Sequence, residues 1–169
     1  MTVNFINKDS KNGFMENAAH SFLVNWTVNF LKNKDIVSKK IRRIESDKGG
    51  FDLYVKYKDR EQYFIIMLEI GNIDSIIQKI DNNSYFSIVT LNSRQNFDAV
   101  IKNWSKLAGY KFLNIIFANP FSNLDKKWIV FPHTHHKICD ESSLETGLKS
   151  MFGMVEQIDW QQLAAKLTG

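Results

Sequence analysis

The stretch GGFDLYVKYKDREQYFIIMLEIG, residues 49–71, is the strongest fold signal in this chain. Its β-branched and aromatic residues, on either side of a charged turn, predict two neighbouring β-strands. Asp52 lies just inside the first strand and Glu69 near the end of the second. With the turn centred near residues 58–62, the two carboxylates come almost opposite each other. Carboxylates placed in this way are suited to bind a divalent cation, and such sites support phosphodiester cleavage.

A carboxylate inside the apolar run YFIIMLEIG is unusual, and two interpretations of it stay open. If the strand is covered on both faces, Glu69 needs a cation, a metal or several hydrogen-bond donors to offset its desolvation. Alternatively, Glu69 lies at an open strand end and pairs with a cation such as Arg42 or Arg43. On the first strand, side-chain alternation predicts that Asp52 shares a face with Tyr54.

The composition predicts one soluble globular domain. The 169 residues are 44% hydrophobic, 24% charged and 13% aromatic, which is enough for a well-filled core. No window approaches the roughly 18 apolar residues of a membrane helix, and the first residues lack the apolar run of a signal peptide. The single cysteine, Cys139, cannot form an internal disulfide, which is typical of a reducing compartment. We therefore expect a cytoplasmic protein with no membrane partner, while a homodimer stays open.

Hydrophobic periodicity predicts helices that alternate with apolar strands. Helices are expected at about 17–32, 73–81, 96–110 and 143–158, with a short helical turn after Trp160; strands are expected at about 36–45, 51–58, 62–70, 85–93 and 112–120, with a strand or extended segment at 126–138. Residues 1–12 are polar and predicted to be flexible. This order favours an α/β fold in which a mixed β-sheet carries helices on both faces.

Basic residues gather just ahead of Asp52. The net charge is only +4, but one short segment contains Lys39, Lys40, Arg42, Arg43 and Lys48. A basic stripe of this kind can follow a phosphate backbone, so nucleic acid is a candidate partner. The alternative is a solvated edge strand, in which lysines discourage pairing with another sheet.

A second candidate site is the histidine-rich segment PHTHHK. In an extended segment His133 and His135 point the same way, a spacing that can bind zinc, and His136 lies beside them. No Cys-x-x-Cys or His-Glu-x-x-His pattern accompanies them. The alternative interpretation is a surface loop whose histidines make hydrogen bonds or touch phosphate. Cys139 lies nearby but has no recognisable nucleophile context.

The order of elements and motifs resembles the αβββαβ core of the PD-(D/E)XK nucleases, a superfamily that includes restriction endonucleases, RecB-type nucleases and archaeal Holliday-junction resolvases. The segment Gly50-Phe51-Asp52-Leu53 matches the Asp motif, except that Phe51 replaces the proline often found there. The segment Leu68-Glu69-Ile70-Gly71 matches the Glu-x-Lys motif, except that Gly71 replaces the lysine. The resemblance covers roughly residues 11–118 and implies a core at 13–118 with a strand and helix extension at 119–169.

The resemblance also implies roles for individual residues of this sequence. Glu16 resembles the glutamate on the first helix of resolvase-like members, and Gln78 resembles a glutamine of RecB-like members. The resemblance implies that Asp52, Glu69 and the backbone carbonyl of Ile70 bind Mg²⁺, for which Mn²⁺ can substitute. It also implies a lysine that orients the attacking water.

Gly71 cannot supply that amine, and Lys79 on the following predicted helix is a candidate replacement. Two functions therefore stay open. One is a Mg²⁺-dependent phosphodiesterase, either an endonuclease or an exonuclease, or a degenerate descendant of one. The other is a non-catalytic interaction or nucleic-acid-binding module on the same fold.

Overall fold

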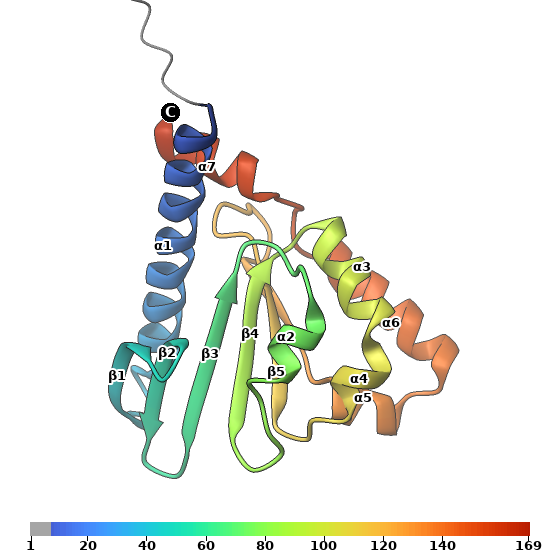
Figure 1. Ribbon diagram of the computed structural model, residues 1–169. Coiled ribbons are helices and arrows are strands. Elements are labelled where there is room, and N and C mark those ends of the chain that lie inside the picture. The colour runs from blue at the N-terminus through green and yellow to red at the C-terminus, as the bar shows by residue number, and fades with distance from the viewer. Residues whose placement is uncertain (1–7) are drawn as a thin grey trace, which may run out of the picture.

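The computed structural model describes residues 8–169, which form one α/β domain (Figure 1). The elements are α1 (Lys8–Asp35), β1 (Ile41–Lys48), β2 (Phe51–Tyr57), β3 (Glu61–Met67), α2 (Ile73–Ile77), β4 (Tyr85–Leu91), α3 (Arg94–Lys102), α4 (Trp104–Ala108), β5 (Leu113–Ala118), β6 (Lys127–Val130), α5 (Pro132–Ile138), α6 (Glu141–Gly153) and α7 (Trp160–Thr168). No helix in this part of the chain is both long and apolar enough to span a membrane.

A six-stranded mixed sheet organises the domain, with the strands side by side in the order β1-β2-β3-β4-β5-β6. The strands β1, β2 and β3 pair antiparallel, β4 and β5 continue parallel to β3, and β6 closes the sheet antiparallel to β5. The expected α/β class and mixed sheet are confirmed.

Each face of the sheet has its own apolar core because side chains alternate along the buried strands. Ile65, Ile88 and Ile115 face one side, where they pack against α2, α3, α4 and α6. The intervening residues Ile66 and Val89 face the other side, where α1 and α7 cover them. Figure 1 shows α7 beside the amino-terminal part of α1, away from the helices of the first core.

The first helix and first strand are displaced from their expected positions. Residues 8–12 are helical rather than flexible, and residues 1–7 lie outside the described part of the chain. The strand expected at 36–45 begins later, as β1 at Ile41, because the Asp35 carboxylate folds residues 36–40 into a turn. It accepts hydrogen bonds from the Ser38 hydroxyl and from the backbone N–H groups of Lys40 and Ile41, at 2.6–2.8 Å.

The later elements are shorter than the sequence predicts. The helix expected at 96–110 divides into α3 and α4 at Asn103, whose side-chain amide donates to the Ala99 carbonyl. The strand expected over 126–138 ends at Val130, because Pro132 occupies the first turn of the helix α5. The helix expected over 143–158 begins at Glu141 and ends at Gly153.

Candidate functional site around Asp52

The register of the β2–β3 hairpin separates the two carboxylates that the sequence places opposite each other. The backbone N–H of Tyr57 donates to the Arg60 carbonyl at 2.8 Å, so the strands are joined by a turn of two residues, 58–59. Leu53 then pairs with Phe64, and one further step places Asp52 level with Ile65. Glu69 lies four residues beyond that level, past the end of β3 at Met67, where residues 68–69 form a bend. The expectation of opposing carboxylates is wrong because the turn is tighter and earlier than predicted.

The Asp52 carboxylate is bound by groups from α1 and β3. One oxygen lies 3.2 Å from the imidazole Nε2 of His20, and the other accepts a hydrogen bond from the Ile66 backbone N–H at 2.7 Å. The same His20 nitrogen lies 2.9 Å from the Ile66 carbonyl. A histidine, a carboxylate and one strand residue therefore form a closed cluster where α1 meets the sheet.

The backbone of β2 explains why Asp52 faces α1. The backbone pairing of β2 with β3 begins only at Leu53. Beyond the paired residues, the Asp52 carboxylate takes the place of a backbone carbonyl and accepts the hydrogen bond from the Ile66 N–H of β3. The alternation of β2 breaks here: Leu53 packs in the core under α1, whereas Phe51 packs on Tyr63. The expectation that Asp52 shares a face with Tyr54 is wrong for this reason, since Tyr54 also packs on Tyr63.

The electrostatics of this cluster favour an ion pair. The hydrogen bond with Asp52 raises the pKa of His20 above its ordinary value of 6.5 and outweighs the opposing effect of burial. Burial raises the pKa of Asp52, but the hydrogen bonds from His20 and from the Ile66 N–H outweigh it and leave the pKa below the ordinary 3.8. The side chains are 37% and 25% exposed, so solvent still reaches the pair.

Glu69 lies in different surroundings from Asp52. It follows the end of β3, is exposed, and lines a cleft of about 320 Å³ together with Arg94 and Asp159. The described residues give it no ion pair, so the expected pairing with Arg42 or Arg43 does not occur; Arg43 pairs with Glu45 instead.

The backbone on either side of Glu69 is fixed by a fully buried asparagine on α3. The Asn96 amide accepts from the Ile70 N–H at 2.7 Å and donates to the carbonyls of Leu68 and Leu91 at 2.9 and 3.0 Å. These three bonds hold the segment after β3 against the end of β4. They also explain why β3 ends at Met67, earlier than the sequence predicts.

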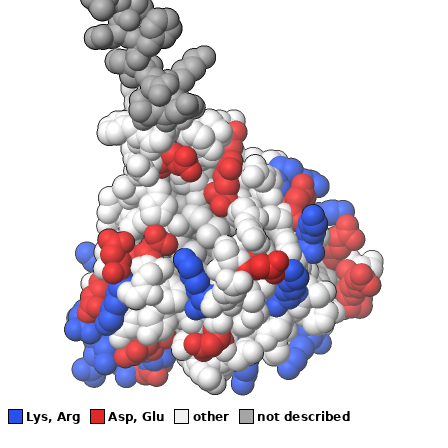
Figure 2. All heavy atoms as spheres, viewed as in Figure 1, with Lys and Arg blue, Asp and Glu red and all other residues white. Residues whose placement is uncertain are grey.

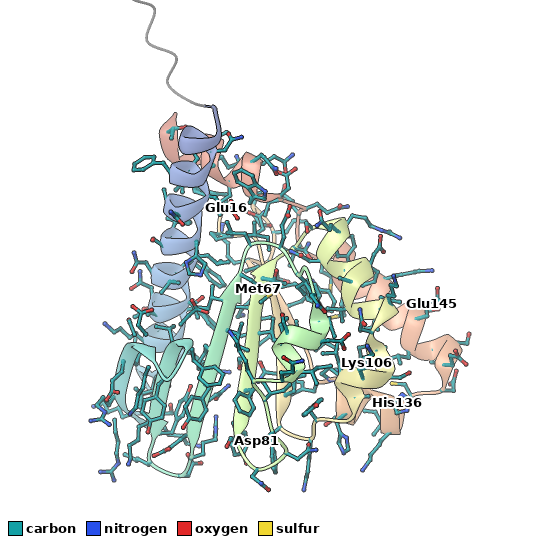
Figure 3. All side chains as sticks on the ribbon, viewed as in Figure 1. Glu16, Met67, Asp81, Lys106, His136 and Glu145 are labelled. Atoms are coloured by element: carbon teal, nitrogen blue, oxygen red, sulfur yellow. The ribbon has the colours of Figure 1, made fainter. Side chains whose placement is uncertain are left out.

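The remaining residues of the expected catalytic set are dispersed. Glu16 is exposed and lies one helical turn before His20 on α1, and Figure 3 shows it above Met67 at the end of β3. Gln78 caps α2 and Lys79 follows it, both exposed. Since α2 packs on the opposite face of the sheet from α1, these two side chains belong to another surface than the Asp52 carboxylate.

The donors around Asp52 do not fit a Mg²⁺ site in this arrangement. Both carboxylate oxygens are engaged, by His20 and by the Ile66 N–H. The second expected ligand, Glu69, lines a separate cleft with Arg94 and Asp159, and the Asp52 side chain is not among the residues that line it. Within residues 8–169, no three His, Cys, Asp or Glu side chains are grouped so that they could hold a metal ion.

The basic segment borders an open groove of about 630 Å³ between α1 and β1. We call it the α1–β1 groove, and its cationic lining consists of Lys32, Lys39, Arg42 and Arg43. Lys40 lies next to it, and Lys48 is held at the far end of β1 by Glu45. Figure 2 shows this lower left region of the molecule as the densest collection of basic side chains in view, with acidic side chains between them.

The histidines of PHTHHK lie on the helix α5, so the expectation of an extended segment is wrong. His133 Nδ1 lies 2.8 Å from the Ala108 carbonyl, and His135 Nδ1 accepts from the Phe131 N–H at 3.2 Å. His136 is exposed on the same helix. Two of the three rings thus make contacts that fasten α5, in agreement with the hydrogen-bonding interpretation.

Sequence reasoning missed two sets of polar residues. One is His20, whose only signal is its position four residues after Glu16, on the same helix face. The other is a row of side chains across three strands: Gln62 on β3, Ser87 on β4 and Asn114 on β5. Its signal is a polar residue at equivalent places in YFSIVTL and LNIIFA, which pair in register.

No family model, no curated protein and no solved structure matches this chain. What the protein does is therefore inferred from the contacts, charges and cavities of its described residues.

Proposed function

We propose that this protein binds nucleic acid through the α1–β1 groove, on a PD-(D/E)XK nuclease-like scaffold whose catalytic arrangement has been lost. The observation that carries the proposal is the row of unpaired cations along this groove. Lys32, Lys39 and Arg42 line it and take part in no ion pair among the described residues. Cations free of acidic partners are available to neutralise phosphates.

A β-bulge turns the arginines of β1 outward. Ile41 pairs with Tyr57 but Arg43 with Lys56, so Arg42 is the extra residue of the edge strand. The bulge allows Ile41 and Ile44, three residues apart, both to pack toward α1. Arg42 and Arg43 stay exposed as a result.

Acidic groups near the groove are already engaged. The Asp35 carboxylate accepts three hydrogen bonds from the turn that follows α1. Glu45 pairs with Arg43 and, at 3.0 Å, with Lys48. These hydrogen bonds do not remove the charge of the carboxylates, but neither Asp35 nor Glu45 forms an ion pair with Lys32, Lys39 or Arg42 among the described residues.

The scaffold part of the proposal is supported by topology. The chain runs α1-β1-β2-β3-α2-β4, and the four strands are neighbours in that order. This is the element order that the αβββαβ core requires. Loss of catalysis is supported by the engagement of Asp52 with His20 and by Gly71 at the lysine position.

The proposal is tested by fluorescence anisotropy with labelled 20-nucleotide single strands and 20-base-pair duplexes over a range of NaCl concentrations. The double variant Lys39→Gln/Arg42→Gln should bind at least tenfold more weakly than wild type. The slope of log K against log[NaCl] should become shallower by about 1.4 for single strands or 1.8 for duplexes, as expected for two lost phosphate contacts.

The matched control is Lys102→Gln/Lys111→Gln, which removes the same charge from exposed sites on α3 and before β5. It should bind like wild type. Equal weakening of both double variants, or binding that does not change with salt, would overturn the groove as the nucleic-acid site. Salt-insensitive association with a protein would instead favour an interaction module.

The same samples test the alternative of a metal-dependent phosphodiesterase. Incubation with Mg²⁺ or Mn²⁺ should leave single strands, duplexes and RNA intact. Cleavage that disappears in Asp52→Ala and in Glu69→Ala would show that catalysis has been retained, whether or not the groove binds the substrate.

A further inference from the structure

A third cavity, besides the cleft at Glu69 and the α1–β1 groove, lies on the same sheet face as α1, between the carboxy-terminal part of that helix and the starts of the parallel strands. Its volume is about 470 Å³, within the roughly 300–1,000 Å³ range of small-molecule sites. Gln62, Ser87 and Asn114 form its floor, and we call this cavity the amide cavity. It shares Asp35 and Ile41 with the α1–β1 groove and is otherwise lined by different residues.

The floor of the amide cavity is a directed chain of hydrogen bonds. The Gln62 amide nitrogen donates to the Ser87 hydroxyl at 2.6 Å, and that hydroxyl donates to the Asn114 amide oxygen at 2.9 Å. Gln62 is 7% exposed and Ser87 is fully buried. Polar groups in the middle of an apolar sheet cost free energy unless they are satisfied, so the row needs an explanation.

The two ends of this chain remain open. No hydrogen bond of the described residues engages the Gln62 amide oxygen or the Asn114 amide nitrogen. The floor thus offers one acceptor and a pair of donors to whatever lies above it. A flat group with donors and acceptors along its edge, such as a nucleobase, is complementary to this surface.

The rim of the amide cavity is cationic. The Arg60 guanidinium lies over the rings of Tyr57 and Tyr85, with its carbon 4.5 and 5.4 Å from their centroids. Its Nε is buried and has no hydrogen-bond partner. Lys34 and Lys40 also line the cavity. The Arg60 Nη1 lies 3.6 Å from an Asp59 carboxylate oxygen, and Asp35 lines the same cavity. The three cations Arg60, Lys34 and Lys40 outnumber these two carboxylates and would attract an anionic oxygen to the rim.

The walls above the floor are apolar and partly aromatic. Phe30 of α1, Ile129 of β6 and Phe131 after β6 line the cavity. Lys127 reaches across from β6 to lie 4.8 Å from the centre of the Phe30 ring. A planar ring inserted here would contact apolar surface on its faces and amide groups at its edge.

We infer that the amide cavity binds a nucleotide, with the base against Gln62 and Asn114 and the phosphate at Arg60. The inference goes beyond the proposed function and does not depend on the groove. The same chemistry is found in a free mononucleotide and in the terminal nucleotide of a strand, and the experiment separates these sources.

Isothermal titration calorimetry with the four ribonucleoside 5′-monophosphates tests the site without any oligonucleotide. At least one should bind saturably, and its nucleoside and inorganic phosphate alone should each bind at least tenfold more weakly. Arg60→Gln and Gln62→Met should each weaken that binding at least tenfold. Lys102→Gln, which removes a charge from a distant exposed site, should bind like wild type. Thermal unfolding of both variants checks that the fold is kept, because Arg60 packs on Tyr57 and Tyr85 and Gln62 is buried.

Fluorescence anisotropy with the labelled single strand distinguishes a free mononucleotide from the terminal nucleotide of a strand as the ligand. If Arg60→Gln weakens both the mononucleotide and the strand, the cavity holds a strand terminus; if only the mononucleotide is weakened, the ligand is free. Absence of saturable binding by all four monophosphates, or equal binding by wild type, Arg60→Gln and Gln62→Met, would overturn the site. Neither result bears on the effect of Lys39→Gln/Arg42→Gln, so failure of the cavity and failure of the groove are distinguishable.

Discussion

His20 Nε2 lies 3.2 Å from the Asp52 carboxylate and 2.9 Å from the Ile66 carbonyl, so one imidazole joins α1 to both strands of the central hairpin. The carboxylate that most resembles a metal ligand in the sequence thus serves, in the folded chain, as the partner of a histidine. Its second oxygen holds the Ile66 N–H at 2.7 Å.

This pair should make stability depend on pH. Because the pKa of His20 lies above 6.5 in the fold, its stabilising contribution is complete below pH 6.5 and is lost as the pH rises through the folded value. Because the pKa of Asp52 lies below 3.8, its contribution is complete above pH 3.8 and is lost as the pH falls through the folded value. The melting-temperature difference between wild type and His20→Gln should therefore be larger at pH 5.5 than at pH 9. An equal difference at both pH values would contradict an ion pair.

The hydrogen bond between the Asp52 carboxylate and the Ile66 N–H predicts that two substitutions of Asp52 differ in their free energy of unfolding. Asp52→Ala leaves a half-buried N–H without an acceptor, and we expect a loss of about 1–3 kcal/mol in the free energy of unfolding. Asp52→Asn keeps an acceptor oxygen at the same place and should lose less. Urea denaturation of both variants measures this order; equal losses would show that only the charge of Asp52 matters, and a larger loss in Asp52→Asn would contradict the prediction.

Asn96 should be a major determinant of the segment that carries Glu69. Asn96→Ala removes three buried hydrogen bonds, and we expect a loss of about 2–4 kcal/mol in the free energy of unfolding. The control is Gln95→Ala, at the exposed neighbouring position, which should change it by no more than about 0.5 kcal/mol. Equal free energies of unfolding for the two variants, measured by denaturation, would show that Asn96 does not hold this segment.

The variant Gly71→Lys tests whether the absent lysine alone explains the proposed loss of catalysis. A Cβ atom at Gly71 would meet no atom within 4 Å, so Gly71→Lys should fold like wild type. We expect no Mg²⁺- or Mn²⁺-dependent cleavage by this variant, because Glu69 stays four residues from the level of Asp52. Cleavage gained by Gly71→Lys in a nuclease assay would show that the two carboxylates still cooperate.

Much of the fold could be predicted from sequence because its signals are local. The apolar runs at β3, β4 and β5 are short and bounded by polar residues, as buried strands require. The stripe that includes Phe97 and Val100 predicted a core-facing helix, and both residues are buried. Boundaries were less predictable where one side chain ends an element, as Asp35 does after α1 and Asn103 does after α3.

The candidate site was less predictable because it depends on which distant residues meet. Asp52 was identified from its motif, but its partner His20 lies 32 positions earlier and has no motif of its own. The row of Gln62, Ser87 and Asn114 exists only because β3, β4 and β5 pair in one particular register. Each member alone is an ordinary polar residue at a strand.

Local sequence is sufficient to predict the α/β class, the two apolar faces of the sheet and the basic character of the segment before Asp52, since hydrophobic period and charge are properties of short stretches. The contact of Asp52 with His20 and its separation from Glu69 arise only when the chain folds. Strand register depends on the geometry of the turn, and a two-residue turn at 58–59 moves every cross-strand pair at once. The register of β3, β4 and β5 assembles the amide cavity, which no single stretch of the sequence contains.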